Sequence, residues 1–195
     1  MLRAIPLALL LAAASTEVAA QWSVGTDITV ARFWGGSQEE HGDRAFRPYR
    51  PTIIGILLEG SVGPMRVGVH GYYGSVSLAL EGGEAVVAVK DALSVHGAAV
   101  EVSRPVATLG TDSRFVIVGG FLIESWSLAG ETSHVRAGFS VGAGLEVSLG
   151  GRWRAVGRGG IAVSGSPFSE TDLDAGFAPR TLWRREVTGR LQFRL

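Results

Sequence analysis

The feature that most constrains the fold is an unbroken alternation of side chains over residues 135–149, which read VRAGFSVGAGLEVSL. Every odd position is apolar, and every even position holds Arg, Gly, Ser or Glu. Successive side chains of a β-strand point to opposite faces, whereas on a helix this pattern would spread the apolar residues over all sides. Since strands in soluble proteins usually have about five or six residues, the segment predicts a long strand with one continuous apolar face.

Similar alternation recurs along the chain and predicts an all-β fold of eight strands. It is clear in WSVGTDITV, MRVGVHGYYG, WRAVGRGGI and the closing VTGRLQFRL. In the segments 51–60, 93–106 and 114–126 both faces carry apolar residues, so their facing stays open. The predicted strands span residues 21–33, 51–60, 65–76, 93–106, 114–126, 134–149, 153–163 and 181–195.

The connections between these strands alternate in length. Those at 34–50, 77–92, 127–133 and 164–180 are mostly long and polar, and those at 61–64, 107–113 and 150–152 are mostly short. Long connections at one end and short ones at the other are typical of an antiparallel up-and-down barrel that crosses a membrane. Residues 77–92 can also pair with each other around the turn EGGE and extend the neighbouring strands.

Proline and aromatic residues agree with a closed barrel. The prolines after residue 20 all fall in predicted connections or at strand ends, as a sheet without edge strands requires. Aromatic residues gather near both ends of the strands, where a membrane barrel has two girdles, although aromatics also favour strands in general. The two sets are Trp22, Trp153 and Phe193 near the short connections, and Trp34, Tyr72, Tyr73, Trp126 and Trp183 near the long ones.

The first twenty residues have the three parts of a cleaved secretory signal peptide. Arg3 supplies a positive charge, residues 4–14 are apolar, and Val18, Ala19 and Ala20 form a small-residue cleavage site. The apolar stretch is too short to span a membrane as a helix. We therefore expect a signal peptide over 1–20 and one barrel domain over 21–195.

Composition narrows the function classes. The formal net charge is +0, so binding to nucleic acid has no electrostatic support. The absence of cysteine excludes disulfides, a zinc–thiolate site and a lipoprotein anchor. The 28 glycines are about twice the ordinary number. So much glycine suits curved, closed sheets, where it marks bends and close backbone approach.

These features together make the chain resemble the bacterial outer-membrane small β-barrel family, the eight-stranded OmpA/OmpX-type proteins. The resemblance covers the signal peptide, the eight segments and the terminal strand. It implies a monomer in the outer membrane, without a cofactor, that contacts outer-membrane lipid and, during biogenesis, the barrel-assembly machinery. It also implies an assembly signal in the last strand, with Leu195 in place of the usual terminal aromatic. The matching residues are Val187, Leu191, Phe193 and Leu195.

An eight-stranded barrel is just wide enough to be filled by its own side chains. The polar faces of the strands therefore predict a lumen network of Arg–carboxylate pairs, in which bases outnumber acids and some Arg heads reach the barrel mouth. Glu59 and Glu124 join it if their strands turn them inward, and a narrow anion-favouring path is the alternative. The predicted lumen residues are Asp27, Arg66, His70, Arg136, Glu146, Arg154, Arg158, Arg184, Glu186, Arg190 and Arg194.

The sequence predicts no catalytic, cofactor or metal site. Barrels of this kind that deacylate lipid A carry a His-x-Ser arrangement, and no histidine here is followed by Ser at the second position. His134, Ser140 and Glu146 share one face of a strand, but six residues span roughly 20 Å, so they do not form one site. The acidic cluster at 169–174 lacks the spacing of a calcium-binding loop, which favours a solvated surface loop.

The function favoured by these features is a non-catalytic outer-membrane barrel that serves envelope structure or surface interaction. A soluble periplasmic, lipocalin-like barrel stays open, and it would bind an apolar ligand with its apolar face turned inward. A lipid A- or phospholipid-modifying outer-membrane enzyme stays open as well. The sequence does not identify a ligand or surface partner, because the long connections would determine which partner binds.

Overall fold

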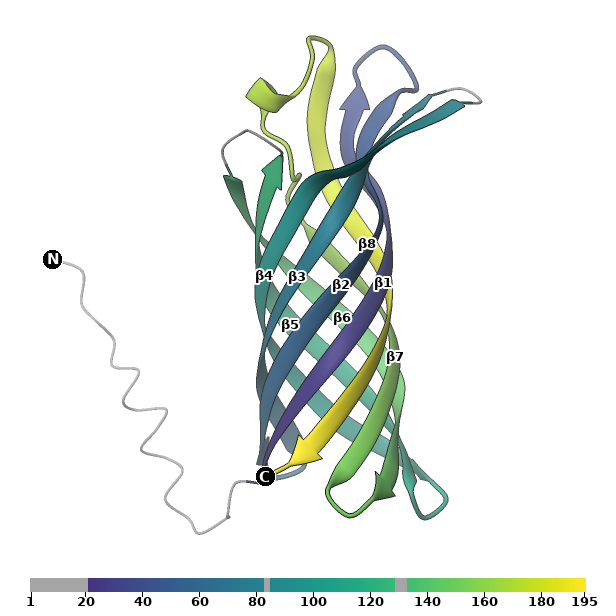
Figure 1. The fold of residues 1–195 in the computed structure, drawn as a ribbon, viewed down its shortest axis with the longest axis vertical. Helices are drawn as coiled ribbons and strands as arrows, with labels where there is room; N and C mark the ends of the chain where they lie inside the picture. The colour runs from purple at the N-terminus through teal and green to yellow at the C-terminus, as the bar shows by residue number, and fades with distance from the viewer. Residues whose placement is uncertain (1–20, 83–84, 129–132) are drawn as a thin grey trace, which may run out of the picture.

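The computed structural model describes residues 21–82, 85–128 and 133–195, and these form a closed barrel of eight antiparallel strands (Figure 1). β1 pairs with β2 and also with β8, which closes the barrel. The predicted all-β fold of eight strands in an up-and-down barrel is confirmed, whereas the predicted signal peptide lies outside the described residues. The strands are β1 (Trp22–Glu39), β2 (Ala45–Val62), β3 (Met65–Gly82), β4 (Ala85–Leu109), β5 (Ser113–Leu128), β6 (Ser133–Gly150), β7 (Trp153–Ser164) and β8 (Phe177–Arg194), with a 3₁₀ turn, η1 (Glu170–Asp172), before β8.

None of the described residues belongs to a helix that is long and apolar enough to cross a bilayer.

At the end away from the C-terminus, the strands run further than the sequence predicts (Figure 1). β2 begins at Ala45 and β8 at Phe177, several residues before the predicted starts. The alternation of side chains stops here, but the backbone ladder continues, because its hydrogen bonds need no apolar face. The predicted extension around EGGE is confirmed, since Gly82 of β3 pairs with Ala85 of β4.

Four prolines lie within strands, which corrects the prediction that all of them fall in connections or at strand ends. Pro48 and Pro51 flank the register shift between Tyr49 and Thr52 in β2, and Pro105 stands at the shift in β4. A bulge leaves a residue out of the ladder, so the missing N–H of proline costs little there. The fourth is Pro179, near the start of β8, opposite Ser37.

Side chains alternate between the exterior and the lumen. On β1, Ile28 and Val30 are exposed, whereas Asp27 and Thr29 are buried. The structure shows which face points inward in the three segments whose facing the sequence left open. The inward side chains are those at odd positions in 51–60 and 93–106 and those at even positions in 114–126. The lipocalin-like alternative requires the opposite facing, because its apolar residues would line the lumen.

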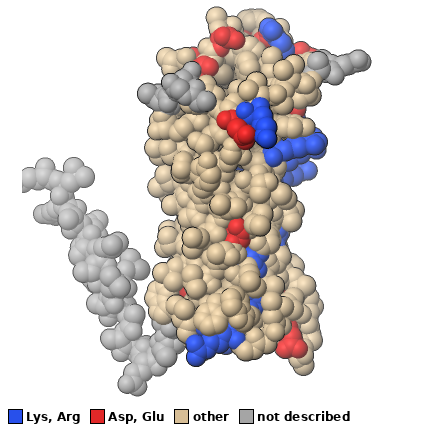
Figure 2. All heavy atoms as spheres, in the orientation of Figure 1, with Lys and Arg blue, Asp and Glu red and all other residues tan. Residues whose placement is uncertain are grey.

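The exposed apolar residues form a belt around the barrel. On β1 the belt runs from Trp22 to Val30, below the exposed Arg32. At about 3.3 Å per residue and a tilt of about 40°, that distance corresponds to roughly 20 Å along the barrel axis, close to the height of about 25 Å expected of a membrane-facing band. Figure 2 shows few charged side chains over this part of the visible wall.

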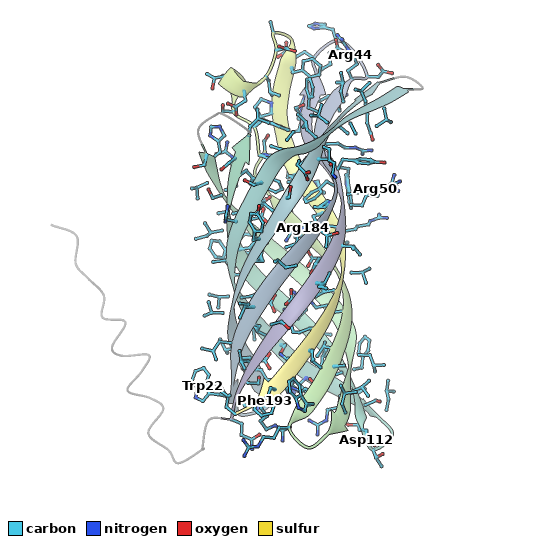
Figure 3. All side chains as sticks on the ribbon, in the orientation of Figure 1. Trp22, Arg44, Arg50, Asp112, Arg184 and Phe193 are labelled. Carbon is cyan, nitrogen blue, oxygen red and sulfur yellow. The ribbon has the colours of Figure 1, made fainter. Side chains whose placement is uncertain are left out.

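The predicted aromatic girdles are correct in part. Trp22 and Phe193 lie at the end of the barrel near the C-terminus (Figure 3). Trp22 and Trp153 are exposed, and Trp153 packs on Phe193 with ring centroids 4.9 Å apart. Tyr72 and Trp126 face the lumen instead, and Trp126 is fully buried. Trp126 was misplaced because the facing of its segment could not be read from the sequence. Exposed aromatic residues at the far end are Tyr73 and Trp183.

Candidate functional site

The lumen has two layers, and the lower one, toward the C-terminus, holds the predicted ion pairs. Its first cluster joins β2, β3, β6 and β7. Arg66 binds Glu146 through both terminal nitrogens, and Arg154 lies 3.0 Å from Glu59. Arg154 also donates to the Ser23 hydroxyl at 2.8 Å. These contacts link strands on opposite sides of the barrel and fill its lower mouth.

The second cluster, at mid-height, is centred on His70. Its Nε2 atom lies 3.0 Å from Asp27 Oδ2, and its Nδ1 atom lies 3.3 Å from Glu101 Oε1. Arg158 donates to both oxygens of Glu101 at 2.9 and 2.8 Å. Arg190 contacts both carboxylates, at 2.9 Å from Asp27 and 3.3 Å from Glu101. Both imidazole nitrogens therefore face acceptors, an arrangement that suits the protonated, positively charged ring.

The third cluster surrounds Glu124, which is 1% exposed. Arg184, labelled inside the barrel in Figure 3, lies 2.5 Å from one of its oxygens and 2.8 Å from Glu186. Tyr72 donates its hydroxyl to Glu124 at 2.8 Å, and Trp126 donates its indole N–H at 3.2 Å. One carboxylate thus organises groups from β3, β5 and β8 at the boundary between the polar and apolar layers.

Acids and bases are equal in number within the ion-paired network, and the excess of bases in the predicted set includes Arg136 and Arg194. Glu59 and Glu124 do face inward, and Glu101, which sequence reasoning missed, stands at the centre. The sequence pattern did not determine whether Glu101 faces the lumen, because both faces of 93–106 carry apolar residues. With His70 counted as a base, the described network has equal numbers of acids and bases: Asp27, Glu59, Glu101, Glu124, Glu146 and Glu186 against Arg66, His70, Arg154, Arg158, Arg184 and Arg190.

Two predicted lumen residues lie outside the network. Arg136 binds the main chain of residues 165–176, through the carbonyls of Ser166 and, at 3.3 Å, of Phe168. Arg194 is exposed at the lower mouth, because it is the last residue of β8. The expectation that some Arg heads reach the barrel mouths is met by these two residues.

The upper layer of the lumen is apolar, whereas the sequence predicted a polar lumen of Arg–carboxylate pairs. Phe168, from the connection between β7 and β8, inserts into it and is 3% exposed. Phe33 and Trp126 pack edge to face with centroids 5.8 Å apart. The buried members of this cluster are Ala31, Phe33, Val76, Leu93, Val95, Trp126, Phe168 and Leu182. The segment 165–176, which we call the cap, therefore closes the upper mouth.

Polar contacts hold the cap in place. Ser166 donates its hydroxyl to the Gly36 carbonyl at 2.6 Å, and His134 lies 2.8 Å from Asp172. Asp172 also accepts from the Ser169 amide at 2.6 Å. Although burial raises the pKa of Asp172, the bonds from Ser169 and the nearby His134 outweigh it, so this pKa is lowered. The predicted solvated acidic loop is therefore partly folded against the barrel.

The remaining sequence candidates do not assemble into a reactive site. His134 faces the cap, whereas Glu146 pairs with Arg66 in the lower cluster, as their spacing predicted. In the part of the chain that the structure describes, no three His, Asp or Glu side chains gather as ligands for a metal ion. The cavity between the mid-height and upper clusters has a volume of about 20 Å³, enough for about one water molecule.

No family model matches the sequence, and no curated protein matches it significantly. Among solved structures, the barrel is similar to Neisserial surface protein A (NspA), with a TM-score of 0.61 and 9% identity over 89% of this chain and 97% of that one. The N-terminal β-barrel domain of OprF from Pseudomonas aeruginosa matches with a TM-score of 0.43, at 12% identity over 89% and 99% of the two chains. Ail, the attachment invasion locus protein of Yersinia pestis, matches with a TM-score of 0.36, at 12% identity over 89% and 99%.

The likeness to NspA agrees with the closed ring of eight strands. The chain has the fold of the eight-stranded bacterial outer-membrane β-barrels.

Proposed function

We propose that this protein is a non-catalytic, monomeric outer-membrane barrel of structural or surface-interaction type. Residues 1–20 act as a signal peptide and residues 21–195 form the barrel. The observation that carries the proposal is the combination of an apolar exterior belt with a lumen closed by its own side chains. Such a molecule needs a bilayer around it and has little room inside for a substrate.

The chemistry of the lumen supports a structural role for its charged residues. The lower and middle clusters link strands that are not neighbours, and each charged side chain in them has an oppositely charged partner. A catalytic acid or base would need access to a substrate, whereas these groups are buried and already paired. Surface interaction is therefore assigned to the outer end of the barrel, where the cap and the extended strands lie.

The last strand supports the proposed contact with the assembly machinery. Val187, Leu191 and Leu195 are exposed on the exterior, and Phe193 packs on Trp153 beside them. Before the barrel closes, the assembly machinery can bind this apolar row at the C-terminus. After closure the same row contacts lipid.

Spin labels on adjacent residues of β6 test the membrane location. Phe139 is 64% exposed on the exterior, and Ser140 faces the lumen. The chain has no cysteine, so Phe139→Cys and Ser140→Cys each place one label at a defined site. In bilayer vesicles, the label at 139 should be accessible to oxygen and shielded from a water-soluble nickel chelate, and the label at 140 should show low accessibility to both. A nickel-accessible label at 139 would show a soluble barrel.

Lipid analysis tests the absence of catalysis. Mass spectra of lipid A and phospholipids from bacteria that produce the protein should match those from bacteria carrying the empty vector. A gained or lost acyl chain that depends on the protein would show that it modifies lipid.

A further inference from the structure

Three arginines on the exterior lie in a row immediately above the apolar belt. Arg32 of β1 and Arg185 of β8 are directly opposite each other, two residues along from the exposed pair Val30 and Val187. Arg50 of β2 and Arg32 line one surface cavity of about 190 Å³. Figure 3 shows Arg50 projecting from the outer wall. We call Arg32, Arg50 and Arg185 the arginine row.

The arginine row has no ion-pair partner among the described residues, in contrast to the arginines of the lumen network. The carboxylates near it are engaged elsewhere: Glu81, in the same cavity, pairs with Arg47, and Asp91 accepts from Ser75 at 2.7 Å. Like charges directly opposite each other on a sheet are destabilising. The pair Arg32–Arg185 therefore costs free energy that an anion placed between the two would offset.

Two of the three guanidinium groups stack on aromatic rings. Arg185 stacks over Trp34 with its Cζ atom 4.9 Å from the ring centroid, and Arg50 stacks over Tyr49 at 5.0 Å. Such stacking leaves the edge of the guanidinium, with its N–H donors, free to bind an anion. Arg50 also has a φ of 40°, within the β2 bulge. Non-glycine residues in this left-handed region carry strain that is common at binding sites.

The position of the row specifies the anion. The side below it is apolar and faces hydrocarbon, so the row lies at the level of lipid headgroups. Guanidinium groups bind phosphate oxygens in bidentate fashion and at lower hydration cost than ammonium groups. A soluble polyanion would gain nothing from the apolar wall below, whereas a phosphorylated lipid would contact both.

We infer that the arginine row binds the phosphate of a lipid headgroup with net negative charge, whose acyl chains lie against Val30 and Val187. The inference rests on the proposed membrane location. It adds a defined lipid site to a barrel that would otherwise contact lipid only through its apolar belt.

Titration with lipid A, which carries two phosphates, tests the site. The wild-type barrel in dodecyl maltoside is compared with the variant Arg32→Gln/Arg50→Gln/Arg185→Gln, and bound lipid is counted by native mass spectrometry. A matched control, Arg104→Gln/Arg114→Gln/Arg152→Gln, removes three exposed arginines near the opposite end of the barrel. We expect the row variant to bind lipid A at least about tenfold more weakly than wild type, and the control to bind it normally.

Three further measurements separate the possible failures. Each variant is first checked for heat-modifiable migration on a gel, which shows a folded barrel; if the wild-type protein lacks it, the proposed function fails rather than the lipid site. Phosphatidylcholine, whose headgroup has no net charge, should bind equally to all variants. Inorganic phosphate at millimolar concentration should not displace lipid A. Equal lipid A binding by the row variant and wild type overturns the inference, and displacement by inorganic phosphate overturns the assignment to a lipid.

Discussion

Glu124 shows at the residue scale how the lumen tolerates buried charge. Its carboxylate accepts from Arg184, Tyr72 and Trp126, and from the Ser164 hydroxyl at 3.3 Å. A buried carboxylate is costly unless its oxygens are fully occupied by donors and a cation is near. Here the donors come from β3, β5, β7 and β8, so the residue joins strands as well as charges.

Replacing this carboxylate with the isosteric amide should destabilise the barrel. In Glu124→Gln the Arg184 guanidinium keeps only Glu186 as an anionic partner. Breaking a buried pair in this way typically costs about 3–5 kcal/mol. Urea titration of tryptophan fluorescence in vesicles measures the free energy of unfolding. Glu40→Gln, the same change at an exposed position, should stay within about 0.5 kcal/mol of wild type. If the two variants are equally stable, the Glu124 cluster does not stabilise the fold.

Individual lumen residues could be predicted from the sequence only where alternation was unambiguous. Asp27, His70 and Arg190 lie in strands with a clear polar face, and all three were correctly predicted to point inward. Glu101 was missed because its neighbours Val100 and Val102 are no more apolar than the inward Val95 and Leu93 of the same strand. In the upper lumen the inward face is apolar, as the lipid-facing side is. The alternation of polar and apolar residues therefore cannot show which side faces lipid there.

At the scale of single elements, β6 presents the most regular lipid-facing surface. Val141 is 66% exposed at mid-height, opposite Gly119 of β5 and Ile161 of β7. The same strand carries Leu149, which is exposed next to the short turn into β7. The two positions therefore differ in depth but share strand and facing.

An arginine scan of these two positions should give a depth-dependent loss of stability. Val141→Arg should lower the free energy of unfolding in vesicles by about 2–4 kcal/mol, because it places a charge near the middle of the bilayer. Leu149→Arg should cost about 0–1 kcal/mol, since its head reaches the interface. Equal costs at both positions, measured by urea titration, would argue that β6 does not cross a bilayer.

The cap is the element that sequence patterning described least well. It has no strand period, and the aromatic side chain that it buries, Phe168, follows a proline in a stretch of small polar residues. Its fold depends on contacts with distant residues such as Arg136 and Gly36. Local sequence cannot encode such contacts visibly, which is why a solvated loop was expected.

The order of the cap should depend on pH. The pKa of Asp172 is lowered below its ordinary value of 3.8, so its bonds are fully present above that value. They are lost as pH falls through the lower, folded-state pKa. An NMR titration should therefore show the Ser169 amide proton shifting upfield below about pH 4. In Asp172→Asn the Ser169 amide should not titrate. A wild-type midpoint above the ordinary carboxyl value would contradict the contacts described for the cap.

At the scale of the whole molecule, the barrel is defined by the pairing of its first and last strands. Asp27 of β1 and Arg190 of β8 are 163 residues apart in sequence, yet they pair inside the lumen across this contact. On the exterior, Val30 and Val187 are directly opposite each other.

Cysteine cross-linking measures the closing register. Directly opposed residues in a sheet have Cβ atoms about 4.5–5.5 Å apart, close to the separation that a disulfide spans. Val30→Cys/Val187→Cys should therefore form an intramolecular disulfide on mild oxidation, and the boiled, unreduced protein should migrate faster on a gel. Val30→Cys/Leu191→Cys, displaced by four residues, should stay reduced. Efficient cross-linking of the displaced pair would show a different register.

The facing of β8 also determines which register with β1 allows the lumen network to form. If β8 slipped by one residue against β1, Arg190 and Arg184 would point into lipid, and Leu191 would be buried against Asp27. The lumen network can therefore be completed in one register alone, and only once β8 has paired with β1. Until β8 pairs with β1, both edges of the sheet stay unpaired and Asp27 lacks its partner Arg190. Closure therefore satisfies the two sheet edges and completes the lumen network in the same step.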